Sequence, residues 1–90
     1  MPTSRGGAAA AILNEALYVF GGEGNTGAAS AVFDAVEAWS FETERWSSLS
    51  PMTTGRHGTG AAAIGDRIYV PGGASVMAFG AVDRVEVFVP

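Results

Sequence analysis

Short runs of apolar residues, separated by glycines and polar turns, fill this 90-residue chain. In its first half the runs cover residues 6–13, 16–20, 35–40 and 46–49. An amphipathic helix would need a longer segment with apolar positions three and four residues apart. The pattern therefore predicts four short strands, with polar turns at Asn14-Glu15 and at 41–45.

The second half of the chain repeats the first. Arg5 returns 51 positions later as Arg56, and after the double glycine the offset falls to 49, because Glu37 returns as Glu86. Loops absorb a two-residue deletion more easily than strands do. The other equivalent positions are Gly7 and Gly58, Tyr18 and Tyr69, Gly21-Gly22 and Gly72-Gly73, and Val36 and Val85. The repeat predicts further strands at 58–63, 67–70 and 84–89.

Four short strands in each period of about 50 residues are typical of a β-propeller blade. The ordered signature resembles the kelch repeat, and it consists of Arg5, Gly7, Tyr18, Gly21, Gly22, Val36, Glu37, Thr43, Trp46, Leu49, Pro51 and Met52, partly repeated by Arg56, Gly58, Tyr69, Gly72, Gly73, Val85 and Glu86. The chain departs from the family pattern at three positions: Trp39 and Phe88 replace a usual Tyr, and Pro71 precedes the second double glycine.

The resemblance implies an all-β fold of two consecutive kelch-type propeller blades, each a four-stranded antiparallel sheet with its first strand innermost. We assign the first blade to residues 1–51 and the second to 52–90, where the outer strand is missing. The small residues on the innermost strands fit the limited space near the central axis of a propeller. The large rings, Tyr18, Tyr69, Trp39 and Trp46, are expected to fill the space between neighbouring blades.

Two blades alone would leave two broad apolar faces open to water. The chain is therefore expected to be part of a partial propeller that associates with missing blades, or to form a homo-oligomeric ring. Three copies would give six blades, a number common among kelch propellers.

Composition removes several classes of protein. The chain has no Cys and therefore no disulfide or Cys-based metal site, and its five Arg, absence of Lys and net charge of −4 disfavour nucleic-acid and anionic-membrane binding. Its longest apolar runs are far shorter than the roughly 20 residues that span a bilayer. Its first residues do not follow the order of charged and apolar regions that is typical of a signal peptide, and we assign no cellular compartment.

One motif suggests nucleotide chemistry. Residues 22–27 fit the spacing G-x-G-x-x-G after a predicted strand, and residues 28–38 could pass as a helix. The second copy lacks this spacing, and the repeat identifies Val36-Glu37 as strand. We therefore interpret the motif as a surface loop and expect no cofactor.

Arg5, Arg56 and His57 are the candidates for a ligand-binding face. In kelch interaction domains, as the resemblance implies, residues at the start of the innermost strand surround the mouth of the central channel, and an arginine there can hold a carboxylate. The alternative is that both arginines pair with acidic residues of a neighbouring blade. A single His gives no metal-ligand spacing, and Glu37 and Glu86, flanked by apolar residues, are expected to be structural partners rather than general acids.

Three possibilities for the function remain. We favour a non-catalytic protein- or peptide-interaction or scaffold module. The alternatives are a piece of a kelch-type carbohydrate enzyme, such as a sugar epimerase, or a structural or engineered fragment with no activity of its own. A copper oxidase is disfavoured, because a single His and no Cys cannot supply its metal site.

Overall fold

The computed structural model describes residues 4–24, 32–52, 55–73 and 85–90. Its seven strands are β1 (Ala9–Leu13), β2 (Ala16–Phe20), β3 (Val36–Ser40), β4 (Arg45–Leu49), β5 (Ala62–Ile64), β6 (Arg67–Pro71) and β7 (Val85–Phe88). The described residues form no helix, and so none that is long and apolar enough to cross a membrane.

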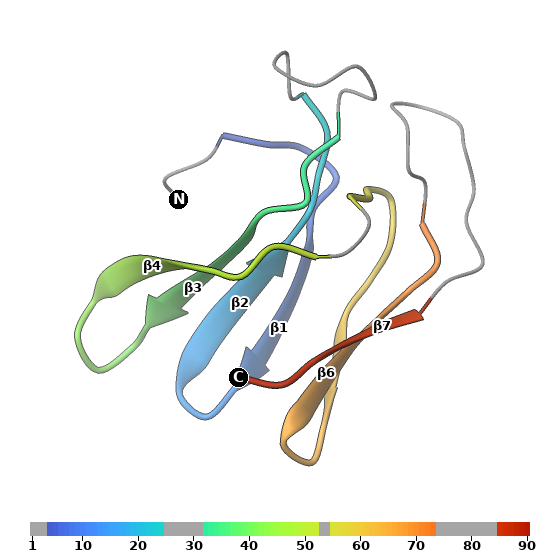
Figure 1. Cartoon of the computed structure of the whole chain (residues 1–90). Coiled ribbons are helices and arrows are strands. Elements are labelled where there is room, and N and C mark those ends of the chain that lie inside the picture. Colours follow the sequence, from blue (N-terminus) through green and yellow to red (C-terminus); the bar gives the residue numbers. More distant parts are fainter. Residues whose placement is uncertain (1–3, 25–31, 53–54, 74–84) are drawn as a thin grey trace.

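The strands form two antiparallel sheets, one after the other along the chain (Figure 1). The first sheet has the order β1-β2-β3-β4, and the second has the order β5-β6-β7. The expected all-β fold, with four strands in the first blade and three in the second, is confirmed. From here we call these sheets blade 1 and blade 2.

Regular pairing starts later than the apolar pattern predicts. In blade 1 the strand begins at Ala9 rather than Gly6, and in blade 2 it begins at Ala62 rather than Gly58. Gly7 and Gly58 both adopt a φ near +64°, at 63° and 65°. That conformation breaks the extended backbone at the same repeat position in both blades. The sequence could not distinguish such a kink from the start of a strand.

Tight turns fix the register of each hairpin. Leu13 pairs with Ala16, so that Asn14 and Glu15 form a two-residue loop, and both have a positive φ, at 50° and 62°. Such a loop matches the right-handed twist of the strands that it joins, and Asn is among the residues that tolerate it. The polar pair predicted as a turn therefore places apolar β2 residues opposite β1.

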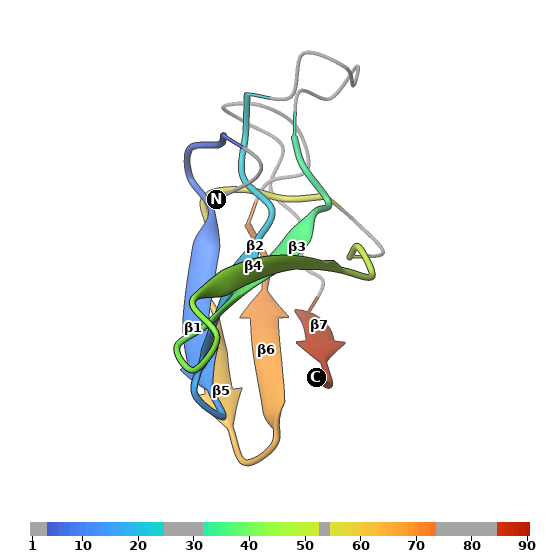
Figure 2. The same cartoon turned by 90° about the vertical axis from the view of Figure 1, so that its left-hand side faces the viewer.

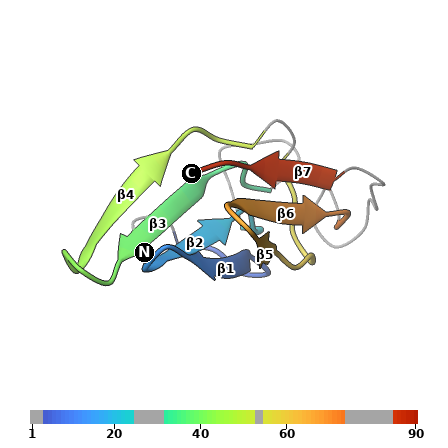
Figure 3. The same cartoon turned by 90° about the horizontal axis from the view of Figure 1, so that it is seen from below.

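The two blades pack face to face, with their innermost strands on the same side. Figure 3 shows β1 and β5 close together at one side and β4 and β7 on the other, and Figure 2 shows β5 beside β1. The hydrophobic core lies between the sheets. Its buried members are Ala9, Tyr18, Phe20, Val36, Ala38, Met52, Ile68 and Val70.

Aromatic rings connect the blades at fewer positions than expected. Tyr18 and Phe20 of β2 each lie 5.5 Å, centroid to centroid, from Phe88 of β7. Trp39 and Trp46 instead contact each other within blade 1, also at 5.5 Å, as cross-strand partners. Side chains alternate between the faces of a strand, so these two rings lie on the face of blade 1 opposite to Ala38. These two rings and Tyr69 lie on faces that point away from the interface between blade 1 and blade 2. That they fill the space between neighbouring blades therefore stays a prediction.

Candidate functional site

The start of each repeat carries a buried arginine. In blade 1, Arg5 Nη2 lies 2.6 Å from Glu37 Oε1, and Nη1 donates to the carbonyl oxygens of Gly21 and Ala35, both at 2.8 Å. The side chain of Arg5 has no exposed surface, and that of Glu37 is 4% exposed. The guanidinium therefore joins the start of the repeat to β3 and to the end of β2.

Blade 2 repeats this arrangement. Arg56 Nη2 lies 2.9 Å from Glu86 Oε1, and Nη1 donates to the carbonyl oxygens of Val70 and Gly72, at 3.0 and 3.2 Å. The Arg56 side chain has no exposed surface, whereas that of Glu86 is 21% exposed. Both pairs use the same repeat positions, so the recurrence seen in the sequence is a recurring structural contact.

This geometry corrects one expectation about the arginines. The pairing predicted with a neighbouring blade occurs within the same blade, because the arginine before each innermost strand reaches across the sheet to the third strand. The structure places both guanidinium groups inside the blades rather than on an open face. Arg5 Nε is also buried, and in the described structure it has no hydrogen-bond partner.

His57 lies at the junction between the repeats. Its Nδ1 is 3.5 Å from Oε2 of Glu23, which follows the double glycine of blade 1, and this contact is an ion pair only when the imidazole is protonated. The residue is 7% exposed. Nearby, Gly58 N donates to Gly7 O at 3.0 Å and Gly22 N donates to Arg56 O at 2.8 Å. The side chain of His57 thus contacts the loop of the other repeat.

The double glycines lie at these contacts for a steric reason. A Cβ on Gly21 would lie 2.2 Å from Arg56 O, and one on Gly73 would lie 2.8 Å from His57 O. Both glycines also have a positive φ, at 65° and 82°. A side chain at Gly21 would push the end of β2 away from the start of the second repeat, and one at Gly73 would push the end of β6 away from the start of its own repeat.

The nucleotide motif has only part of its length within the described residues. Glu23 pairs in isolated β-bridges with Gly6 and with Val32, and residues 25–31 lie outside the described residues. The helix considered for residues 28–38 would end in a segment that forms β3 instead. Within the described part of the chain, no group of three or more His, Cys, Asp or Glu side chains could hold a metal ion.

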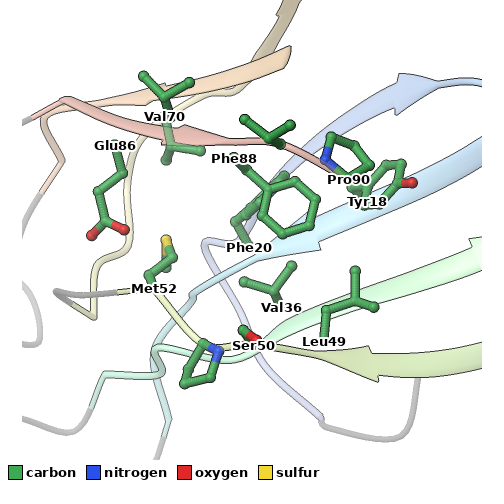
Figure 4. Close-up of a pocket in the computed structure, with 13 residues that line it drawn as sticks. Tyr18, Phe20, Val36, Leu49, Ser50, Met52, Val70, Glu86, Phe88 and Pro90 are labelled. Atoms are coloured by element: carbon green, nitrogen blue, oxygen red, sulfur yellow. The ribbon is translucent and has the colours of Figure 1, made fainter. Parts of the chain in front are cut away.

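A cavity of about 490 Å³ opens between the outer parts of the two blades (Figure 4). Its wall on blade 1 includes Tyr18, Phe20 and Val36 together with residues 49–52, and its wall on blade 2 includes Val70 and residues 86–90. Apolar side chains dominate this lining, and Glu86 contributes a carboxylate that is already paired with Arg56. Sequence reasoning did not identify this site. Its walls come from segments about 40 residues apart that meet only when the blades pack.

Comparison with known proteins agrees with this architecture. The kelch motif matches residues 4–53. A curated relative, the Kelch-like protein terF of Aspergillus terreus, is 32% identical over all 90 residues, and the chain spans about a fifth (20%) of the length of that relative. The motif covers more than half of the chain, including the whole four-stranded blade and the arginine that precedes it. The chain belongs to the kelch-repeat family.

Proposed function

We propose that this chain is a non-catalytic protein-interaction module that binds further blades through the open faces of its two sheets. One comparison carries the proposal. Val36 of blade 1 is 2% exposed, because blade 2 covers it, whereas its repeat equivalent in blade 2, Val85, is 57% exposed. Exposed apolar patches of this kind mark sites of protein association.

Neighbouring positions show the same contrast. Ala38 in blade 1 is 7% exposed, and its equivalent Val87 is 46% exposed. Ile64, at the end of β5, is 63% exposed. The outer face of blade 2 therefore has the apolar character of the covered face of blade 1, and the described residues form no third sheet that covers it.

The face of blade 1 that points away from blade 2 is the surface that we expect to pack on the outer face of another blade 2. Ile68 is fully buried where blade 2 packs on blade 1, and Leu17, its repeat equivalent in blade 1, is only half-buried. Ile12, on the same face of blade 1, is 61% exposed. The two open faces of one chain thus correspond to the two sides of its internal interface. Head-to-tail contacts of this type close into a ring when the rotation allows it, and three copies giving six blades are the ring that we propose.

Two further observations support a binding role rather than catalysis. Both repeated arginines already use their guanidinium groups for internal contacts, so neither is presented to a substrate in the described structure. The similar Aspergillus terreus protein is called kelch-like, and this name mentions no enzymatic reaction. When further blades are present in a longer chain, the same faces would bind those blades instead of a second copy.

The solution mass tests this proposal. Light scattering coupled to size exclusion should give about three times the 9.2 kDa of one chain, and Ile64→Lys should give a monomer, because a charge cannot be buried unpaired in the blade interface. Phe41→Lys is the matched control: Phe41 is 49% exposed, but it lies in the turn between β3 and β4. A folded wild-type chain that stays monomeric at every concentration would contradict self-association. Equal behaviour of the two variants would contradict the use of the blade face.

A further inference from the structure

The side chain of His57 is buried at the junction between the two repeats. It is 9% exposed, and its Nδ1 lies 3.5 Å from Oε2 of Glu23. His57 belongs to the second repeat, whereas Glu23 follows the double glycine of the first. The contact therefore joins the repeats through two side chains whose charges depend on pH.

Backbone hydrogen bonds hold both residues in place. Glu23 N donates to Gly6 O at 2.7 Å, and Gly6 N donates to Glu23 O at 3.1 Å. The residues on either side of His57 form hydrogen bonds between the repeats, at 2.8 and 3.0 Å. Because both backbones are fixed, an ion pair here loses less side-chain entropy than a pair between long surface side chains.

The pair is specific to this junction. The arginine–glutamate contact recurs in both blades. In contrast, the equivalent of His57 in the first repeat is Gly6, and the equivalent of Glu23 in the second is Ala74. The repeats thus share the blade fold but not this pair, so the fold itself does not account for the pair.

The other charged groups around His57 have their own surroundings. Arg5, on the segment before β1, and Arg56, next to His57 in the chain, each hold a carboxylate of their own blade. Asp34 lies on the segment before β3, which accepts a hydrogen bond from Arg56 N, and it is exposed to water. The end of β6 approaches the His57 carbonyl at Gly73, which has no side chain. A positive charge on the imidazole therefore faces the carboxylate of Glu23.

We propose that His57 and Glu23 form a proton-dependent clamp, which holds the two repeats together more tightly at mildly acidic pH than at neutral pH. Imidazole side chains generally gain a proton between about pH 7 and 6, a range in which glutamate side chains keep their negative charge. Protonation of His57 turns the contact into an ion pair that the unfolded chain lacks. The added stability is therefore present below about pH 6, and it is lost as the pH rises through the range of the imidazole.

Burial of the imidazole acts in the opposite direction, because it disfavours the charged form. Two features of the site reduce this cost. The carboxylate is in direct contact with the ring, and the Glu23 side chain is 31% exposed, so that water still reaches the pair. We therefore expect the ion pair to outweigh the loss of hydration.

Urea unfolding at about pH 5.5 and about pH 8 tests the clamp. The parent chain for this test is Ile64→Lys, at a concentration where light scattering gives the mass of one chain, so that association does not contribute. We expect its equilibrium constant for folding to be about three- to fivefold larger at the lower pH, relative to the same ratio for Glu23→Gln. Glu23→Gln keeps the size of the side chain and an amide oxygen that can accept a hydrogen bond, but it removes the charge.

Two further variants locate the effect. Asp34→Asn also removes one carboxylate, but from an exposed side chain, and it should keep the pH ratio of the parent chain. His57→Gln should lose the ratio as Glu23→Gln does, whereas a merely structural role of His57 would lower stability equally at both pH values. Amide hydrogen exchange gives a local readout. Protection of the Gly22 and Gly58 N–H groups, which cross the junction, should rise about three- to fivefold at the lower pH after correction for intrinsic exchange rates.

Equal pH ratios for the parent chain and Glu23→Gln would overturn the proposal. A parent chain that is the more stable at about pH 8, relative to Glu23→Gln, would also overturn it, because burial of the imidazole would then outweigh the ion pair. The same holds for a pH ratio that persists in His57→Gln or disappears in Asp34→Asn. All of these values are measured on single chains, so a failure of self-association and a failure of the clamp are distinguished.

Discussion

Glu37 Oε1 lies 2.6 Å from Nη2 of Arg5, and the side chains of both residues are almost entirely hidden from water. Two charges buried together are tolerated because each supplies the counter-charge of the other and two carbonyl oxygens accept further hydrogen bonds from the guanidinium. The same contact recurs in blade 2, where Glu86 is more exposed. The pair thus fixes the start of each repeat to the third strand of its own sheet.

Removal of Glu37 should be strongly destabilising. Glu37→Leu leaves the Arg5 charge buried without its counter-charge, and we expect the free energy of unfolding to fall by about 3–5 kcal/mol. Glu37→Gln should cost less, because its amide oxygen can still accept the hydrogen bond. Glu86→Leu should also cost less than Glu37→Leu, since water reaches the partly exposed site in blade 2. Urea unfolding followed by circular dichroism measures all three values, and an equal loss for Glu37→Leu and Glu86→Leu would contradict the role assigned to burial.

Gly21 should not tolerate a side chain. A Cβ at this position would meet Arg56 O at 2.2 Å, and the residue has a φ of 65°. We expect Gly21→Ala to destabilise the chain by more than about 1 kcal/mol, through backbone strain and the loss of close contact between the repeats. Gly60→Ala is the control, because nothing lies within 4 Å of its Cβ and its φ is not in the positive region. Thermal unfolding compares the two variants, and similar midpoints would show that the close approach at Gly21 is not required.

The strands and their order could be predicted from sequence because each depends on local alternation and on a repeat visible in the chain itself. The recurrence of Arg5 and of Glu37 indicated structural roles for both residues, yet the partners of the arginines were expected in a neighbouring blade. The actual pairing depends on the register between strands, which brings residues 32 positions apart into contact. The cavity between the blades was not predictable for the same reason. Ser50 and Pro90 come to line one cavity only when the two sheets pack together.

The position of each aromatic residue predicts its contribution to the stability of the chain. Phe20 is 1% exposed and lies between the blades, so Phe20→Ala should lower the free energy of unfolding by about 3–5 kcal/mol. Trp46→Ala should cost less, because Trp46 is only half-buried and its ring contact is with Trp39 of the same blade. A double-mutant cycle between Tyr18 and Phe88 should give a coupling of about 0.5–1.5 kcal/mol, as expected for rings in contact. Zero coupling, or a larger loss for Trp46→Ala than for Phe20→Ala, would mean that the interface between the blades does not stabilise the isolated chain.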